Sequence, residues 1–596
     1  MPIVLSDKKE HKLIEKMPNW LKDFNSLFYY FLFLFFLGMV FLGTSLFTDY
    51  FTTPFTGDYC AQQISFYTNG YDDWWHFFKT GEFNFYDTNT FLGVDNIGAN
   101  SFYYLFDPFF FLVLFFPRSF IAQAMAIITI IKICCAALTF YAYMRYMKVS
   151  RNSAKIAGIA YAFSGWTAWY LWFNHFTEIT VILPLMFLGI EKILQEKRPW
   201  ILMVAITLMG FTNFFFLLSL IICAFIYAMF RFFQRMKDHS VKDNLSFLGI
   251  GFFAFLGGLL MSMMVVLPSA LYALNSPRAN NNFYLEDIKE ALGNHDFKKL
   301  LSLIFVWTEQ GNTAVNNARY FFPFINFMFP SMSDRGTPLM IFNNDSYDNT
   351  AGNIFCFIPN VILLVPAFID RIKRKQYSVI VATSLFIIAL FTPFCYYALH
   401  GFTQVYSRWN IFFVFCLIAF VGMYLDKLKD EKFVNLIIGV FFALGLSITA
   451  IVSSKLISDK FNEFEPRIPT FVAAFEIVYI LILGAVLLFV RVKKTNKIHI
   501  TLLSFISLEV ALMGAFTIYG HGVEDYMQTN KGYNKNIALS ALTAKTKKND
   551  PSYYRSYSSL ASGAASNDGM RNNYNGLSFF HSVYNYNTAD ICNYSS

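Results

Sequence analysis

Charged side chains are scarce in this sequence. Of its 596 residues, 14% are Asp, Glu, Lys or Arg and 56% are hydrophobic, whereas a soluble domain carries roughly 25% charged residues. The chain therefore has more apolar side chain than a globular core could bury, and lipid must cover the excess. This composition excludes an ordinary soluble protein and predicts an integral membrane protein.

Cysteine patterns and nucleotide-binding motifs are also missing. Six of the eight cysteines lie in or beside apolar runs, where a thiol acts as a small hydrophobic group. No Cys/His spacing typical of zinc occurs, and pairing of Cys60 with Cys592 stays open. Residues 93–98 are glycine-rich, but no strand signal precedes them and no GKS or GKT follows. Zinc modules and phosphate-binding loops are therefore not predicted.

Apolar runs long enough to cross a bilayer recur along the chain, since about 20 residues are needed. We predict an all-α polytopic integral membrane protein with about thirteen transmembrane helices. The expected spans lie near 27–47, 120–143, 154–172, 178–194, 200–216, 218–233, 247–267, 352–369, 377–396, 410–425, 433–453, 470–490 and 499–519.

Lys and Arg gather in every second short loop, which predicts that those loops are cytoplasmic. The N-terminus is then cytoplasmic, the C-terminus is extracytoplasmic, and the chain is a multi-pass protein of a plasma membrane. Basic clusters occur at Lys8–Lys22, Arg145/Lys148/Arg151/Lys155, Lys192/Lys197/Arg198, Arg231/Arg235/Lys237/Lys242, Arg371/Lys373/Arg374/Lys375, Lys427/Lys429/Lys432 and Arg491/Lys493/Lys494/Lys497. Because the net charge of +8 is concentrated in these loops, we predict no nucleic-acid partner.

The same rule divides the chain into regions. A cytoplasmic basic arm covers 1–26, and a transmembrane domain covers 27–519, with extracytoplasmic loops at 48–119 and 268–351. The segment 520–596 is polar and is expected to be an extracytoplasmic, incomplete domain.

Two apolar stretches can be assigned to spans in more than one way, and the charge pattern decides between the assignments. Residues 200–233 fit the charge pattern as two short helices broken near Asn213. Residues 102–117 fit it as an interfacial or re-entrant segment whose aromatic residues, Tyr103 and Tyr104 among them, lie at headgroup depth.

Asp58 is the first candidate for chemistry, because it follows the first apolar run by about eleven residues. A carboxylate beside lipid could have a raised pKa and act as a general base. It could equally hold a divalent cation, and no other cofactor is indicated. The structural alternative is a solvated turn residue after Gly57.

His175 and Glu178 form the second candidate, in a short turn between two apolar runs. Their three-residue spacing places them on one face if the following helix begins early. Alternatively, Glu178 stabilises a helix N-terminus.

Arg408 and Lys132 are candidates for binding an anion. Arg408 lies at the non-basic end of a span, and its forked guanidinium group matches two phosphate oxygens. The alternative is an interfacial arginine whose side chain reaches the lipid headgroups. Lys132 lies near the middle of a span, where an ionisable residue costs a few kcal/mol and is a functional candidate by default. A salt bridge within the bundle is the alternative.

Short motifs in a fixed order resemble the YfhO family of bacterial membrane proteins, members of the GT-C superfamily of glycosyltransferases. The resemblance covers nearly the whole chain, and Glu178 stands where the family pattern has Asp. The motifs are Gly57-Asp58 with Gln62/Gln63, Leu92-Gly93, Tyr103-Tyr104, Asp107-Pro108, Ala162-Phe163-Ser164-Gly165, Glu178 with Leu183-Pro184-Leu185, Thr212-Asn213-Phe214-Phe215, Gly401-Phe402, Arg408-Trp409, Ser552-Tyr553-Tyr554-Arg555, Asn575-Gly576 and Phe579-Phe580-His581-Ser582.

The resemblance implies transfer of a sugar from an undecaprenyl-phosphate-linked donor to a teichoic-acid or related anionic cell-surface polymer. Asp58 would then deprotonate the acceptor hydroxyl, while Arg408 and Lys132 would bind the lipid phosphate as charge develops. His175, Glu178, Asn213, Tyr103 and Tyr104 are expected to line the same cavity. Two alternatives remain open from the residues: a transporter or flippase for a lipid-linked envelope precursor, and a non-enzymatic assembly protein.

Overall fold

The structure is a computed structural model of the chain. It describes residues 19–43, 46, 51–52, 58–90, 93–171, 173–236, 238–276, 283–307, 319–330, 354–402, 406–430, 432–460, 468–493, 497–515, 530–550, 552, 556 and 567–576. Helices make up almost all of the regular structure in these ranges, and one two-stranded sheet is present there.

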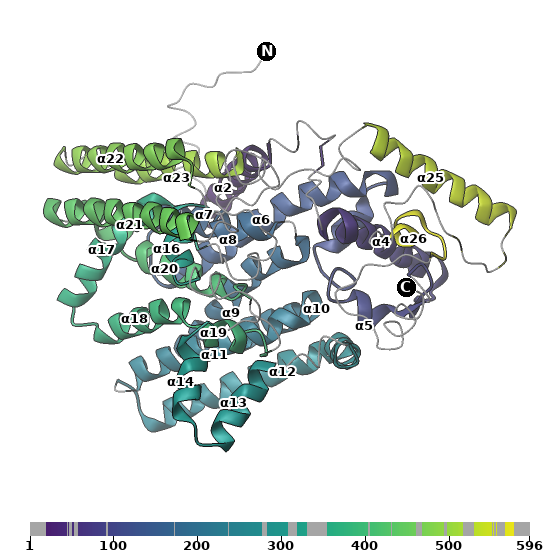
Figure 1. Cartoon of the computed structure of the whole chain (residues 1–596), viewed down its shortest axis with the longest axis horizontal. Helices are drawn as coiled ribbons and strands as arrows, with labels where there is room; N and C mark the ends of the chain where they lie inside the picture. Colours follow the sequence, from purple (N-terminus) through teal and green to yellow (C-terminus); the bar gives the residue numbers. More distant parts are fainter. Residues whose placement is uncertain are drawn as a thin grey trace, which may run out of the picture.

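Helices of different lengths, most of them apolar, pack beside one another and form a bundle (Figure 1). They are α2 (Asn19–Phe41), α6 (Ile121–Tyr146), α7 (Arg151–Ala162), α8 (Gly165–Tyr170), α9 (Thr177–Glu196), α10 (Trp200–Thr212), α11 (Phe214–Arg235), α12 (Val241–Leu274), α17 (Ile358–Lys373), α18 (Tyr377–Phe391), α20 (Asn410–Gly422), α21 (Phe433–Lys460), α22 (Thr470–Val492) and α23 (Ile498–Met513). Each predicted span therefore has a helical counterpart.

Six helical stretches of the described chain are long and apolar enough to cross a membrane: Arg118–Tyr146, Phe214–Arg235, Val241–Leu274, Asn410–Leu428, Phe433–Ile457 and Thr470–Val492. Shorter apolar helices accompany them at Ser26–Phe41, Trp200–Thr212, Tyr377–Phe391 and Ile498–Met513. These helices support an all-α membrane protein, whereas the count of thirteen spans stays a prediction.

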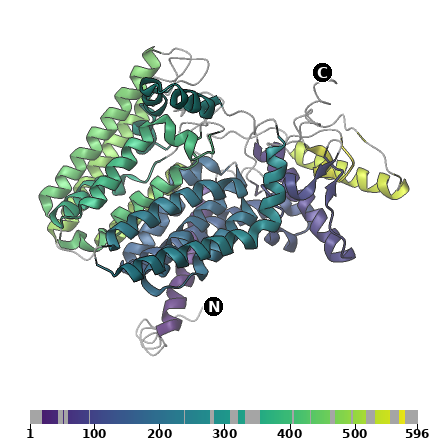
Figure 2. The same ribbon diagram turned by 90° about the horizontal axis from the view of Figure 1, so that it is seen from below.

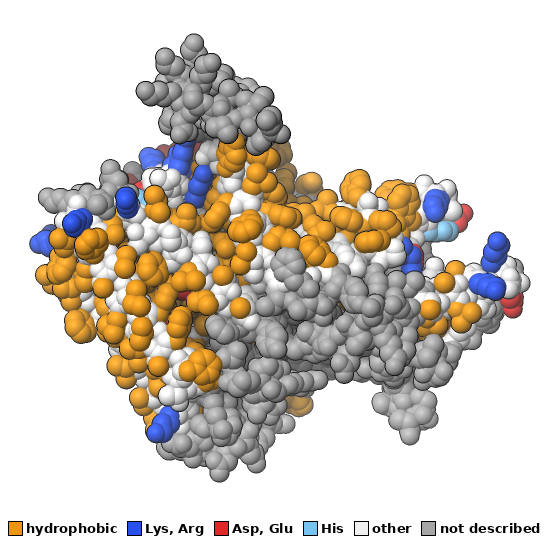
Figure 3. Space-filling model, turned by 90° about the horizontal axis from the view of Figure 1, so that it is seen from above, with side chains coloured by type: hydrophobic (Ala, Val, Ile, Leu, Met, Phe, Trp, Pro, Cys, Tyr) orange, Lys and Arg blue, Asp and Glu red, His pale blue; other side chains and the backbone are white. Residues whose placement is uncertain are grey.

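The surface of the bundle is apolar, as lipid contact requires. Figure 3 shows hydrophobic side chains over much of the described face, and rings such as those of Phe252, Phe441 and Phe489 are more than half exposed. In the apolar window of α12 only 22% of residues are buried, against 72% in the windows that contain α6 and α20. The helices α6 and α20 are therefore central, and α12 lies at the periphery.

Two helix boundaries test the sequence predictions. The break near Asn213 is confirmed, because α10 ends at Thr212 and α11 begins at Phe214. The span predicted over 154–172 is not one continuous helix, since α7 ends at Ala162 and α8 begins at Gly165. The chain turns at Ser164, and the amide of Gly165 donates to the carbonyl of Phe355 at 2.9 Å, which satisfies a donor that the break releases.

Residues 58–120 fold into compact structure beside the bundle. The elements are a π-helical turn η1 (Tyr59–Gln63), α4 (Ile64–Thr80), β1 (Tyr86–Asp87), β2 (Val94–Asp95), α5 (Asn96–Asn100) and the 3₁₀ turns η2 (Phe110–Phe115) and η3 (Arg118–Phe120). The two strands are antiparallel, with Tyr86 opposite Asp95. The described part of 102–117 holds only turns and η2, consistent with the prediction that it is not a span.

Two helices from the C-terminal region lie beside α4 (Figures 1 and 2): α26 (Asp568–Asn572) packs against α4, and α25 (Asn530–Asn549) packs against α26. The Thr88 hydroxyl donates to Asn575 Oδ1 at 2.9 Å, and Arg118 Nη2 donates to the carbonyl of Arg571 at 3.0 Å. We call the described residues of 58–120 together with α25 and α26 the loop subdomain. The remaining short helices are α13 (Phe283–Gly293), α14 (Phe297–Phe305), α16 (Phe322–Met328), α19 (Pro393–Ala398) and the 3₁₀ turns η4 (Asn174–Phe176) and η7 (Leu425–Asp430).

Described residues of the basic clusters form ion pairs at one end of the bundle, which we call the basic end. Lys197 pairs with Asp243 at 3.2 Å, joining the end of α9 to the start of α12, and Lys427 pairs with Asp370 at 2.7 Å, joining η7 to α17. The helices α6, α9, α11 and α20 begin at the opposite end, beside the loop subdomain, which we call the loop end.

Close helix packing in the bundle depends on Gly439 of α21. A Cβ added there would meet the backbone carbonyl of Ile362 in α17 at 2.1 Å. Small residues allow such close approach between membrane helices. We predict that Gly439→Ala lowers the free energy of unfolding by about 1–3 kcal/mol, as overpacking usually does.

The matched control is Gly445→Ala on the same helix, where an added Cβ meets nothing within 4 Å. Thermal unfolding of the purified protein in detergent should show a lower Tm for Gly439→Ala alone. Equal Tm values for the two variants would contradict the packing of α17 on α21.

Candidate functional site

Lys132 is the centre of a buried polar cluster. It lies eleven residues after Ile121, the first residue of α6, which is about 16 Å at the usual helical rise. Its ammonium group forms an ion pair with Glu178 and lies 4.0 Å from Asp107 Oδ2. It also donates to the backbone carbonyl of Asn174 at 3.1 Å. All of these groups are buried, so the charges are compensated within the protein.

Two carboxyl groups therefore share one ammonium group. Asp107 accepts from the backbone amides of Phe109 and Phe110, each at 3.1 Å. Burial raises the pKa of Asp107 well above its usual range, and the nearby carboxylate of Glu178 raises it further, while Lys132 lowers it. A proton on Asp107 leaves Glu178 and Lys132 as a neutral pair, which avoids an excess buried charge.

The turn η4 is positioned by Asn213 and by Thr129 of α6. Asn213 Nδ2 donates to the carbonyl of His175 at 3.3 Å, and its Oδ1 caps α11 by accepting from the amide of Phe216 at 3.2 Å. The hydroxyl of Thr129 in α6 donates to Asn174 Oδ1 at 3.2 Å. The break at Asn213 thus fixes the backbone of the turn that carries His175.

His175 presents an imidazole surrounded by aromatic rings. Its ring centroid lies 4.5 Å from that of Phe176 and 5.0 Å from those of Phe102 and Tyr103. Neither ring nitrogen has a hydrogen-bond partner among the described residues. Burial lowers the pKa of His175 well below 6.5, and the charges of Arg408 and Lys132 lower it further. The imidazole is therefore neutral and has an acceptor nitrogen available.

Arg408 lies in an aromatic cage formed with Phe173, Phe176, Phe215 and Tyr406. Its guanidinium carbon is 3.9 Å from the ring centre of Tyr406, 4.8 Å from that of Phe176, and 5.9 Å from those of Phe173 and Phe215. Such contacts stabilise a cation by about 0.5–2 kcal/mol each. No described carboxylate pairs with this guanidinium, and its buried Nε donates to none of the described residues. The cage therefore holds a positive charge that described acidic groups do not neutralise.

The backbone beside Arg408 is fixed by α8. The indole of Trp166 donates to the carbonyl of Arg408 at 3.0 Å, and the Tyr170 hydroxyl lies 3.0 Å from that of Ser407. The break between α7 and α8 directs these two aromatic side chains toward the start of α20. This explains why the motif at 162–165 and the motif at 408–409 belong to one site.

The structure thus brings Lys132, Glu178, His175, Tyr103, Asn213 and Arg408 together at the loop end. Tyr104 belongs to a neighbouring network, where its hydroxyl accepts from Asn69 Nδ2 at 3.4 Å. Asp58 is half-buried and directly precedes η1, nine residues before Tyr67, whose hydroxyl accepts from Lys132 at 3.4 Å. A catalytic role for Asp58 stays a prediction.

Sequence reasoning missed Asp107, Asn174 and Tyr67 as site residues. Asp107 was part of a motif but was not linked to Lys132. The available signal was the buried lysine itself, because an ionisable residue in a span requires a counter-charge. Nothing in the sequence showed which of the many loop carboxylates supplies it.

A second polar network stabilises the loop subdomain. Asp73 accepts from Asn84 Nδ2 and Asn96 Nδ2, both at 3.0 Å, and Asn69 Nδ2 donates to Asp87 at 3.2 Å. Burial and then the charge of Asp87 raise the pKa of Asp73 to about 7. Within the described residues no group of three or more His, Cys, Asp and Glu side chains could hold a metal ion.

These features define a polytopic α-helical membrane protein with a recessed polar site at one end of the bundle. Within the described residues, the site combines the charge-compensated cluster around Lys132 with the guanidinium of Arg408, to which no described carboxylate is paired. The chain belongs to the family described as bacterial membrane protein YfhO, whose model matches residues 28–333 and 337–594.

A curated relative supports the same family. A protein of Bacillus subtilis (strain 168) with the printed name "Uncharacterized protein YfhO" is 40% identical over 78 residues, which are 13% of this chain and 9% of that protein. No solved structure matches the chain significantly.

The ion cluster makes a prediction about stability. Lys132→Met leaves two buried carboxyl groups without a cation, and we expect it to lower the free energy of unfolding by about 3–5 kcal/mol, as removal of one partner of a buried pair does. Glu178→Gln keeps Asp107 as a partner of Lys132 and should cost less. Thermal unfolding in detergent measures both.

The double variant Lys132→Met/Glu178→Gln provides the control. It should be more stable than Lys132→Met alone, because the second change removes the unpaired carboxylate. Additive losses of Tm would show that the two side chains do not interact.

The raised pKa of Asp73 predicts a pH dependence. The folded state retains the proton up to about pH 7, whereas the unfolded chain releases it near the usual Asp value of about 3.9. The stability of the loop subdomain should therefore fall as pH rises from about 4 to 7, by a few kcal/mol in total. Asp73→Asn mimics the protonated carboxyl group, so its Tm should differ least from that of wild type at pH 5 and more as the pH rises. A difference in Tm that stays constant from pH 5 to 8 would contradict the raised pKa of Asp73.

Proposed function

We propose that this chain is a membrane glycosyltransferase that transfers a sugar from an undecaprenyl-phosphate-linked donor to a teichoic-acid or related cell-surface polymer. The activity takes place at the loop end of the bundle, which the distribution of Lys and Arg predicts to be extracytoplasmic. Membership of a bacterial membrane protein family supports the cellular setting.

The observation that carries the proposal is the Arg408 cage. Aromatic rings hold the guanidinium in place, and no described carboxylate competes for it. A planar guanidinium donates two parallel hydrogen bonds to phosphate oxygens. The cage therefore suits the phosphate of a lipid-linked donor, whose chain can lie against the apolar surface of neighbouring helices.

The proposed reaction uses Arg408 at the leaving group and Asp58 at the acceptor. The oxygen of an acceptor hydroxyl bonds to the anomeric carbon of the sugar, and the bond from that carbon to the donor phosphate oxygen breaks. The electron pair of the broken bond stays on the phosphate, and Arg408 stabilises the negative charge that develops there. Asp58 takes the hydroxyl proton, in line with the resemblance to GT-C enzymes.

The cluster around Lys132 has a positioning role in this scheme. Its charge is matched by Glu178 and Asp107, so direct binding of phosphate by Lys132 stays a prediction. The cluster fixes η4, and η4 carries His175 and Phe176 to Arg408. The neutral His175 can accept a hydrogen bond from a hydroxyl group of the sugar or of the acceptor.

A transporter of a lipid-linked precursor is the second candidate, and the buried Lys132 with the break at Asn213 favours it. Transport would move the intact donor between leaflets without releasing polyprenyl phosphate. The two functions therefore differ in their products.

The test uses the purified full chain in lipid nanodiscs with a synthetic polyprenyl-phosphate sugar, with and without a divalent cation, and a glycerol-phosphate polymer. Release of polyprenyl phosphate and transfer of sugar to the polymer are measured. We predict that Asp58→Asn and Arg408→Gln each lower kcat by about 100-fold or more, as loss of a group that acts in the transition state does.

Arg371→Gln is the matched control. Arg371 also lies over an aromatic ring, 5.7 Å from the centre of Phe420, but at the basic end of the bundle. It should retain wild-type turnover. Full turnover by Arg408→Gln, or sugar release that is equal in all variants, would rule out the proposed site.

A further inference from the structure

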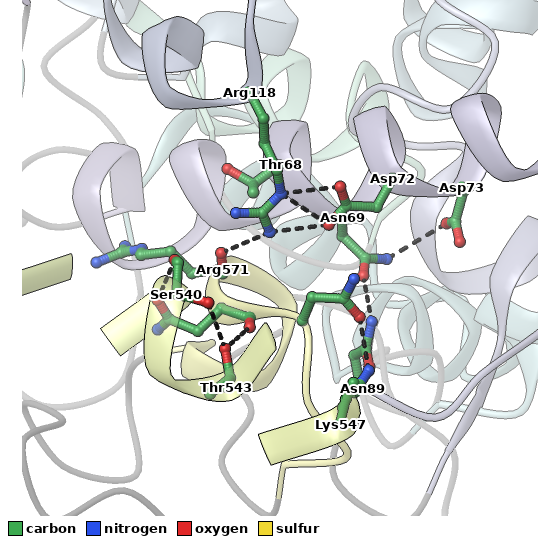
Figure 4. A network of polar contacts seen from close by, with 12 residues as sticks. Thr68, Asn69, Asp72, Asp73, Asn89, Arg118, Ser540, Thr543, Lys547 and Arg571 are labelled. Atoms are coloured by element: carbon green, nitrogen blue, oxygen red, sulfur yellow. Dashed lines mark hydrogen bonds and ion pairs between the residues drawn. The ribbon is translucent and has the colours of Figure 1, made fainter. Parts of the chain in front are cut away.

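A cavity of about 560 Å³ lies between the loop subdomain helices, separate from the Arg408 cage. One wall of the cavity is α4 and the opposite wall is α25. The start of α6 and the end of α26 line the rest of the cavity. It joins parts of the chain more than 400 residues apart, since Arg118 donates to the carbonyl of Arg571. Figure 4 shows these polar side chains converging from α4, α25 and α26.

The two walls use regular helical spacing. Ser540, Thr543 and Lys547 line the cavity from one face of α25, and Thr68 and Asp72 line it from α4. The seven helical steps from Ser540 to Lys547 extend about 10 Å along the helix axis. The cavity is therefore an elongated groove with hydroxyl groups along its length.

Among the described residues that line this groove, positive charge exceeds negative charge. Three of them are cations, Arg118, Lys547 and Arg571, and one is a carboxylate, Asp72. Arg118 already engages Asp72 through Nε and Nη2, each at 2.8 Å. Lys547 donates to the amide oxygen of Asn573 at 2.9 Å and pairs with no carboxylate among the described residues. Its side chain is exposed, so an incoming anion can reach it.

Each cation is held by neighbours. Arg571 is buried and donates through Nε to the Ser65 hydroxyl at 3.1 Å. Ser540 and Thr543 donate to the side-chain and backbone oxygens of Asn572 at 2.8 and 2.7 Å, which fix α26 on α25. These contacts hold the positive groups at set positions before a ligand arrives, which lowers the entropic cost of binding.

We infer that this groove binds a phosphodiester-linked polyol chain, with Lys547, Arg118 and Arg571 facing its phosphates and Ser540, Thr543 and Thr68 facing its hydroxyls. The groove presents both cations and hydroxyl groups, which a polymer of phosphate and polyol units requires of its binding site. The groove is formed partly by α25, which lies at the far side of the molecule from α21 and α22 (Figure 1), so a polymer reaches it without entering the bundle. The inference rests on the proposed function, for which it names the acceptor-binding region.

The test measures binding of a fluorescent glycerol-phosphate oligomer to the full chain in nanodiscs of zwitterionic lipid by fluorescence anisotropy. Lys547→Gln should raise Kd by about three- to fivefold at low salt, as loss of one exposed ionic contact does, and the difference should vanish at high salt. Lys545→Gln is the control, because it removes the same charge from the same helix outside the groove. Its Kd should equal that of wild type.

Three further results decide the inference. Equal Kd values for Lys547→Gln and Lys545→Gln would overturn the groove while leaving sugar transfer intact. If Lys547→Gln loses binding to vesicles that contain phosphatidylglycerol but binds the oligomer as wild type does, the groove binds lipid headgroups and the inference is overturned. Loss of oligomer binding in Lys547→Gln without sugar transfer in any variant would support the groove and refute the proposed function. Arg408→Gln should bind the oligomer as wild type does, which separates the two sites.

Discussion

The ammonium group of Lys132 lies among the carboxyl groups of Glu178 and Asp107, inside a helix bundle whose surface is apolar. In such surroundings a charge without a partner costs several kcal/mol, so the three segments that carry these groups must stay together. The middle of α6, the start of α9 and the turn at Asp107 are thereby fixed relative to one another. Because η4 directly precedes α9, the same constraint sets the positions of His175 and Phe176.

Arg408 differs from Lys132 in how its charge is treated. Lys132 is surrounded by acidic groups, whereas Arg408 is surrounded by aromatic faces that hold a cation without neutralising it. The first arrangement stabilises the fold, and the second leaves electrostatic attraction available for an anionic ligand. The two cations act on a shared neighbour, since both lower the pKa of His175. Structural and ligand-directed charges thus lie next to each other at one end of the bundle.

Much of the fold follows from local sequence features. Apolar runs give the helices of the bundle, and Asn213 ends one helix and caps the next as its residue type favours. The break between α7 and α8 is not visible in the apolar run 154–172, because the freed amide is satisfied by Phe355, a residue far away in the chain. In the same way, residue type and position selected Lys132, His175, Glu178 and Arg408 as candidates but not their partners.

The sequence by itself determined the class of protein and the positions of most helices, because apolar composition and helix formation depend on neighbouring residues. It also determined the family, through short motifs in a fixed order. Only the tertiary structure decided that Asp107 completes the cluster of Lys132, that Arg408 lies among aromatic rings with no described carboxylate paired to it, and that α25 faces α4 across a cationic groove. These pairings join residues tens to hundreds of positions apart. Their free energy depends on distance and burial in space, which the order of residues along the chain does not specify.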